Sequence, residues 1–319
     1  MRPTFIVLAV CCVVMIAGVA VTYGMQPDTG FDVKDNGDGT ATMEVTGMMP
    51  TEISYMVLSD TDAPATIYMY LDDRYEGFVS YREQDRYLSA LSDALSKRGF
   101  DNTEIIDADR LAQILDDPAA SDRGVVIASG AIPVPAYPSD SDNKVLTFLS
   151  NGGTVYWSGP DIGLYRSVID DEPVKIENGG YFGDSINDGE EECDVFEASD
   201  VSEKMRFACY TADYGLKANL PESRVLGLYD EYSSLSVAKV LSGRVYVLGC
   251  YLSTLEAEEM YSYADMIVSG ITEDTVFKET GSFHKGFGRE TRTVDISAGD
   301  TVYMASGKPA TFRGGVFGF

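Results

Sequence analysis

Between residues 64 and 163 the sequence alternates short apolar strands with amphipathic helices, and this alternation constrains the fold more than any other feature. The apolar runs cover residues 66–71, 103–106 and 124–128, and a fourth lies just before Gly159. Ser80 and Glu83 form a capping box ahead of one helix, and Asp107 precedes the next. Strand and helix in this order favour a parallel sheet with right-handed crossovers. We therefore expect a doubly wound, mostly parallel α/β sheet over residues 63–272.

The two ends of the chain have a different texture, which is typical of antiparallel strands. Residues 31–45 alternate in character around Asn-Gly and Asp-Gly pairs, which supply the backbone conformations of a hairpin turn. Residues 291–304 alternate in the same way. Because the termini of a domain often lie close together, we expect residues 25–62 and 273–319 to pack as one small β module.

The N-terminus carries an export signal. Arg2 precedes an uncharged apolar run from Phe5 to Val21. As a helix this run spans about 26 Å, slightly less than the roughly 30 Å hydrocarbon core of a bilayer. Its length suits either a cleaved signal peptide or a retained signal anchor, and both alternatives stay open. Residues 1–24 therefore place the rest of the chain outside the cell or on its surface.

The charge balance excludes one class of partner. The chain has 24 Lys and Arg residues against 51 Asp and Glu residues, a formal net charge of −27. Such a surface repels nucleic acid, so we expect no DNA or RNA partner. No motif points to a cofactor.

Residues 164–220 interrupt the strand–helix rhythm and are rich in glycine and acidic residues. We interpret them as an insertion that overhangs the carboxyl edge of the sheet. Cys193 and Cys209 lie in it and are candidates for a disulfide in an oxidising exterior. Cys250 ends an apolar strand and is expected to be a buried thiol. With no CxxC spacing among these cysteines, we expect no metal site.

Ligands of open α/β sheets bind at the carboxyl ends of the strands, so the loops there form the expected site. The candidate ligand-binding residues are Asp72, Asp73, Ser129, Gly130, Gly159, Asp161 and Tyr251. The plainer alternative is that Asp72 and Asp73 cap a turn and that Asp161 caps a helix.

Two short motifs resemble the class I glutamine amidotransferase-like family, which has a flavodoxin-type α/β fold. Residues 159–163, Gly-Pro-Asp-Ile-Gly, look like the family's G-x-nucleophile-x-G elbow after a strand. Ser129 and Gly130 are similar to the loop that helps to form the family's oxyanion hole. The resemblance covers roughly residues 64–163 and 221–271.

The departures from this pattern affect the chemistry. Asp161 stands where the family has its nucleophilic cysteine, and the family's strand-borne His-x-Glu is missing. The only histidine, His284, lies outside the α/β region. A carboxylate is a poor nucleophile towards an amide, so the resemblance implies a non-catalytic member that lacks the Cys/His pair.

Two functions remain. The first is an exported or membrane-tethered surface protein whose inactive domain binds a protein or a carbohydrate. The second is an extracellular hydrolase, glycan- or metal-dependent, that uses the strand-end carboxylates Asp72, Asp73 and Asp161. We favour the binding function and therefore expect no enzymatic activity.

Overall fold

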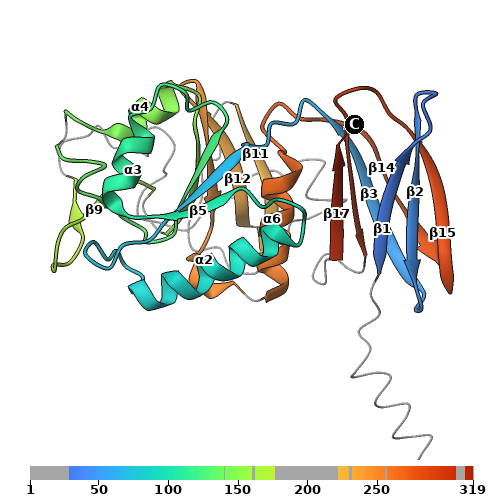
Figure 1. Cartoon of the computed structure of the whole chain (residues 1–319), viewed down its shortest axis with the longest axis horizontal. Helices are drawn as coiled ribbons and strands as arrows, with labels where there is room; N and C mark the ends of the chain where they lie inside the picture. The colour runs from blue at the N-terminus through green and yellow to red at the C-terminus, as the bar shows by residue number, and fades with distance from the viewer. Residues whose placement is uncertain are drawn as a thin grey trace, which may run out of the picture.

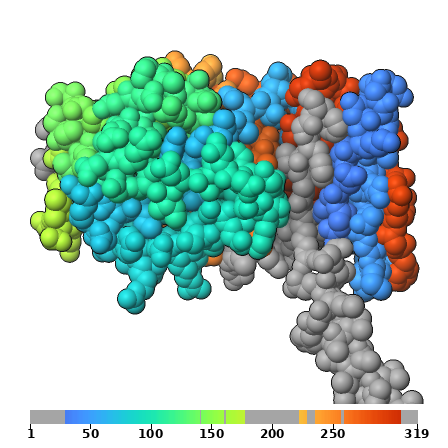
Figure 2. Space-filling model, in the orientation of Figure 1, coloured from blue at the N-terminus to red at the C-terminus, as the bar shows by residue number. Residues whose placement is uncertain are grey.

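The computed structural model describes residues 29–139, 141–159, 162–176, 222–229, 232–255, 257–306 and 313–318. These residues build a β-sandwich and an α/β part that lie side by side along the long axis of the molecule (Figure 1). The space-filling view shows the two parts in close contact (Figure 2).

Strands from both ends of the chain form the β-sandwich. They are β1 (Gly30–Asp35), β2 (Thr40–Gly47), β3 (Thr51–Ser59), β14 (Val276–Lys285), β15 (Gly288–Asp295), β16 (Thr301–Ser306) and β17 (Arg313–Gly318). One sheet has the order β1-β2-β15 and the other β14-β3-β16-β17, and every pairing is antiparallel. In β2 the side chains of Ala41, Met43 and Val45 are buried and their neighbours are not, as expected for a strand with one face on a core.

A seven-stranded sheet forms the centre of the α/β part. Its strands are β4 (Thr66–Tyr70), β5 (Thr103–Ile106), β6 (Arg123–Ile127), β8 (Thr154–Ser158), β11 (Ser223–Tyr229), β12 (Tyr232–Val240) and β13 (Gly243–Leu248). Their order is β11-β12-β13-β8-β6-β4-β5. The strands from β13 to β5 are parallel, whereas β12 is antiparallel to both β11 and β13.

Helices cover both faces of this sheet. They are α2 (Tyr81–Ser96), α3 (Ala108–Leu115), α4 (Lys144–Ser150), the 3-10 turn η1 (Leu252–Thr254) and α6 (Ala257–Ser269). α2 and α6 share one hydrophobic core with the sheet, and α3 and α4 share the other. A small three-stranded sheet of β7 (Ile132–Pro133), β9 (Tyr165–Ser167) and β10 (Val174–Lys175) is added beyond the carboxyl ends of the parallel strands.

The prediction of a doubly wound, mostly parallel α/β fold is wrong for the chain as a whole. In the described residues strand predominates over helix, and the sheets are mixed or antiparallel. The alternation between residues 64 and 163 describes only the central strands. The strands of both termini and the β11–β12 hairpin contribute the antiparallel pairings that outnumber the parallel ones.

The start of α2 follows the sequence expectation. Ser80 is its N-cap and accepts a hydrogen bond from the Glu83 amide, while the Ser80 hydroxyl donates to the Glu83 carboxylate at 2.7 Å. Asp107 caps α3 in the same manner through the Arg110 amide. Both caps satisfy amides that the first turn of a helix leaves without a partner.

A buried ion pair of the α/β part is also contacted by the sandwich. Asp265 of α6 is fully buried. Its carboxylate accepts hydrogen bonds from the guanidinium of Arg98, just beyond α2, at 2.5 and 3.3 Å. The hydroxyl of Tyr303 in β16 donates to the same carboxylate at 3.3 Å. Burial raises the pKa of Asp265, and the Arg98 guanidinium opposes that shift. The hydrophobic core around this contact contains residues of both parts, including Met56 and Ala264.

We predict that Asp265→Ala lowers the free energy of unfolding by about 3–5 kcal/mol, because it leaves the Arg98 charge buried without its partner. Urea unfolding followed by circular dichroism measures this loss. Asp93→Ala, which removes an exposed pair with Lys97, is the matched control and should change stability little. Tyr303→Phe removes only one hydroxyl and should cost about 1 kcal/mol. Equal losses in Asp265→Ala and Asp93→Ala contradict the prediction.

Candidate functional site

The parallel strands bring most of the predicted site residues to one edge of the sheet. Asp72 and Asp73 follow β4, Ser129 and Gly130 follow β6, and Gly159 follows β8. Tyr251 comes after β13. Asp161, Cys193 and Cys209 lie outside the described residues, so their predicted roles stay predictions.

The loops after β6 and β8 touch each other directly. Gly130 and Gly159 both have positive φ angles, of 72° and 123°. A Cβ atom added to Gly159 would lie 2.5 Å from the Cα of Gly130, and one added to Gly130 would lie 3.1 Å from the ring of Tyr251. These two positions therefore require glycine, and the loops after β6 and β8 meet at backbone distance.

Ser129 is also engaged within the protein. Its hydroxyl is fully buried and donates to the carbonyl of Ala131 at 2.7 Å. Its own carbonyl accepts from the amide of Phe78 at 2.8 Å, and a Cβ atom on Gly77 would lie 2.1 Å from that oxygen. The segment of Gly77 and Phe78, which the sequence did not single out, thus closes this part of the edge.

Asp72 has a structural role in the described contacts. Its carboxylate is buried and accepts from the Arg74 guanidinium at 2.7 and 3.0 Å and from the Ala108 amide at 3.0 Å. Burial opposes ionisation, but these hydrogen bonds outweigh it and hold the pKa of Asp72 below its usual range. Such a carboxyl stays ionised and is unsuited to act as a general acid.

His284 and Cys250 do not meet. His284 lies on β14 of the sandwich, is exposed, and faces Glu52 across 3.7 Å. Cys250 is a buried thiol just after β13 in the α/β part, as the sequence predicted. The histidine therefore activates neither this thiol nor a described site residue.

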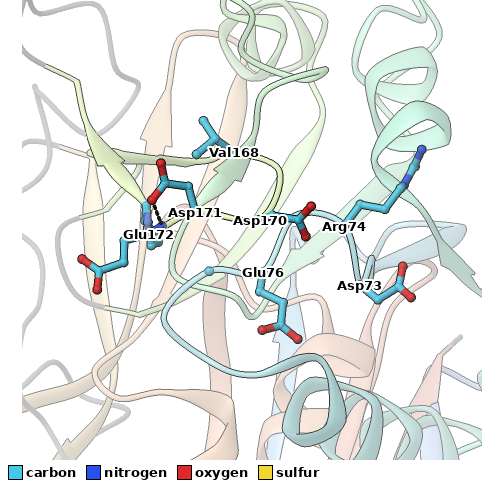
Figure 3. Close-up of a pocket in the computed structure, with 9 residues that line it drawn as sticks. Asp73, Arg74, Glu76, Val168, Asp170, Asp171 and Glu172 are labelled. Atoms are coloured by element: carbon cyan, nitrogen blue, oxygen red, sulfur yellow. Dashed lines mark hydrogen bonds between the residues drawn. The ribbon is translucent and has the colours of Figure 1, made fainter.

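An open cavity of about 430 Å³ lies beside the closed loops. Two segments face each other across it, one after β4 and one between β9 and β10 (Figure 3). It is lined by Asp73, Arg74, Glu76, Gly77, Val168, Asp170, Asp171, Glu172 and Pro173, and we call it the acidic cavity. Of the predicted site residues that the structure describes, only Asp73 lines it.

Negatively charged side chains predominate in the lining of the acidic cavity. Five of its lining residues are carboxylates, and its one cation, Arg74, is already bonded to Asp72 and Asp109. Large apolar side chains next to the lining residues are exposed as well: Phe78, Ile169 and Val174. The arrangement therefore offers both negative charge and apolar contact surface.

The sequence offered one signal for this cavity. Asp170, Asp171 and Glu172 form a short acidic run ahead of Pro173, but the same composition recurs through the predicted insertion. No group of three or more His, Cys, Asp or Glu side chains in the described ranges could hold a metal ion. Within those ranges, too, no helix is long and apolar enough to cross a membrane. The apolar run from Phe5 to Val21 lies outside them.

Comparisons with known proteins assign no family. No family model matches the chain, and no curated protein matches it. A solved structure with partial likeness is the exo-β-1,4-mannosidase Op5Man5 from Opitutaceae bacterium strain TAV5, at 14% identity and a TM-score of 0.34. The match covers 65% of this chain and 34% of that one. A likeness this weak transfers neither fold family nor activity, and the amidotransferase resemblance stays a prediction.

We predict that Asp72→Asn costs about 2 kcal/mol of unfolding free energy at pH 7, since it weakens charge-assisted hydrogen bonds to a buried carboxylate. The folded pKa of Asp72 is lowered, so its stabilisation is present above the unfolded value of 3.8 and is lost as the pH falls through the folded value. The difference in unfolding free energy between wild type and Asp72→Asn should therefore become smaller below about pH 4.

The adjacent residue provides the control for this measurement. Asp73 is exposed, and Asp73→Asn should change stability by less than about 0.5 kcal/mol at any pH. Urea unfolding at pH 7, 5 and 3.5 makes the comparison. If the loss of unfolding free energy in Asp72→Asn is the same at all three pH values, Asp72 does not stabilise the fold as an ionised carboxylate.

Proposed function

We propose that this chain is a non-catalytic binding protein, tethered to a membrane and facing outward, whose acidic cavity takes a basic segment of a partner protein. The observation that carries the proposal is the acidic cavity itself, an open hollow at the carboxyl edge of the sheet with five carboxylates in its lining. Ligands of α/β sheets bind at this edge.

The exposed apolar side chains beside the cavity favour a protein partner over an isolated cation. Phe78, Ile169 and Val174 flank the lining residues and stay open to solvent. A segment that alternates lysine or arginine with apolar residues meets both features, because its cations face the carboxylates and its apolar side chains cover these three residues.

The packing of the neighbouring loops supports a role without chemistry. Gly130 and Gly159 leave no room for a substrate atom between them, and Asp72 is held ionised by Arg74. The hydrolase alternative relied on Asp72, Asp73 and Asp161 acting together. Of the two that the structure describes, Asp72 and Asp73, only Asp73 lines the cavity, so the described contacts favour the binding function.

The tether is inferred from the sequence. The run from Phe5 to Val21 follows a single arginine, which is the pattern of an export signal or signal anchor. We include its retention in the proposal, so that the folded chain stands outside the cell on a membrane.

Binding of a synthetic peptide of alternating lysine and leucine tests the cavity. We predict that the triple variant Glu76→Gln, Asp171→Asn, Glu172→Gln weakens binding about tenfold, because three screened ion pairs of roughly 0.5 kcal/mol each amount to about one decade. Isothermal titration calorimetry at physiological salt measures the dissociation constants.

The control must separate the cavity from the overall charge of −27. The triple variant Asp32→Asn, Glu290→Gln, Asp295→Asn removes the same charge from exposed positions of the sandwich. It should bind the peptide as wild type does. If both triple variants weaken binding equally, attraction is non-specific and the proposal fails. Ile169→Ser should weaken binding of this peptide but not of a peptide of lysine alone.

A further inference from the structure

Two turns at one end of the β-sandwich expose large apolar side chains. Met48 and Met49 lie in the turn between β2 and β3, and Phe287 lies in the turn between β14 and β15. Their exposed fractions are 73%, 53% and 80%. The register places Gly288 opposite Gly47 and Lys285 opposite Thr51, so the turns are neighbours. We call these three residues, Met48, Met49 and Phe287, the apolar tip.

A buried lysine holds the two turns together. Lys285 is fully buried, and its Nζ donates to the carbonyl of Gly47 at 2.8 Å and to the carbonyl of Gly286 at 2.9 Å. One bond reaches the β2–β3 turn and the other the β14–β15 turn. The apolar tip therefore stands on a fixed base, which lowers the entropy cost of binding a surface.

The surroundings of the tip differ in charge from the rest of the chain. Residues 44–52 and 284–292 contain three carboxylates and three basic side chains, and so carry no net formal charge with histidine neutral. One of the carboxylates is paired, Glu44 with Arg289, and another, Glu52, lies 3.7 Å from the ring of His284. In a chain with a net charge of −27 this neutral patch avoids the repulsion that the acidic surface has for a lipid headgroup layer.

The chain enters the sandwich at the same end. Gly30, the first residue of β1, pairs with Thr46, two residues before the β2–β3 turn. Figure 1 shows β1 beginning at that end of the sandwich. Residues 22–29 connect the apolar run to β1, and eight residues reach at most about 28 Å. A membrane that holds the run therefore lies close to this end.

We infer that Met48, Met49 and Phe287 insert into the surface of the bilayer that anchors the N-terminal run. The inference rests on the tether of the proposed function and adds a second contact to it. A bilayer fits this surface better than a second copy of the chain, because the tether brings lipid to this end. Side chains of this kind bury readily at the boundary between headgroups and acyl chains.

Tryptophan fluorescence tests this insertion in the full chain. The sequence has a single tryptophan, Trp157, which is fully buried and gives a constant background. We predict that Phe287→Trp, reconstituted in phosphatidylcholine vesicles, is quenched by brominated acyl chains at least about twofold. Val276→Trp is the control, because Val276 is exposed at the opposite end of the sandwich, where it pairs with Ser59. It should keep its intensity.

Adding Met48→Ser and Met49→Ser to the Phe287→Trp variant should reduce the quenching. A chain that floats with the vesicles while the Phe287→Trp and Val276→Trp variants are quenched equally overturns the inference and leaves the tether standing. A chain that does not float overturns both. An emission shift of the Phe287→Trp variant that depends on chain concentration without lipid shows a second copy on the tip and also overturns the inference. Peptide binding in solution tests the acidic cavity independently.

Discussion

The packing of the two parts encloses a carboxylate that is removed from water, that of Asp265. Arg98 and Asp265 are stable in the core only as a pair, and the Tyr303 hydroxyl of the sandwich completes the site. The contact involves Arg98 after α2, Asp265 of α6 and Tyr303 of β16, so a hydrogen bond of the sandwich reaches the ion pair of the α/β part. A continuous hydrophobic core surrounds it and contributes most of the burial free energy.

Close packing at the carboxyl edge decides where a ligand can be held. Gly77, Gly130 and Gly159 let three loops approach one another at backbone distance, so the position used by ligands in many α/β sheets is occupied by the protein itself. The open volume lies further out, in the acidic cavity between the loop after β4 and the segment after β9. The carboxylates there remain in contact with solvent, which favours binding of a cation over acid–base chemistry.

Local features of the fold could be predicted from the sequence in detail, and long-range ones only in outline. The capping box of Ser80 and Glu83 and the buried strand at residues 66–71 depend on neighbours in the chain, and both appear. We expected residues 25–62 and 273–319 to form one β module, but no local pattern encodes the individual pairings, such as β3 with β14, more than 200 residues apart. Likewise the partner of Asp72 is Arg74, two residues on, but its burial against Ala108 follows only from the fold.

Under the proposed function, the cavity and the apolar tip gain from belonging to one chain with a membrane tether. Burial of three exposed apolar side chains contributes at most a few kcal/mol of binding free energy. This is too little to hold a free protein on a bilayer. With the run from Phe5 to Val21 in the same membrane, the second contact becomes intramolecular and is favoured by a high effective concentration. Because Lys285 fixes the two turns that carry the apolar tip, this weak contact would hold the sandwich in one orientation on the bilayer.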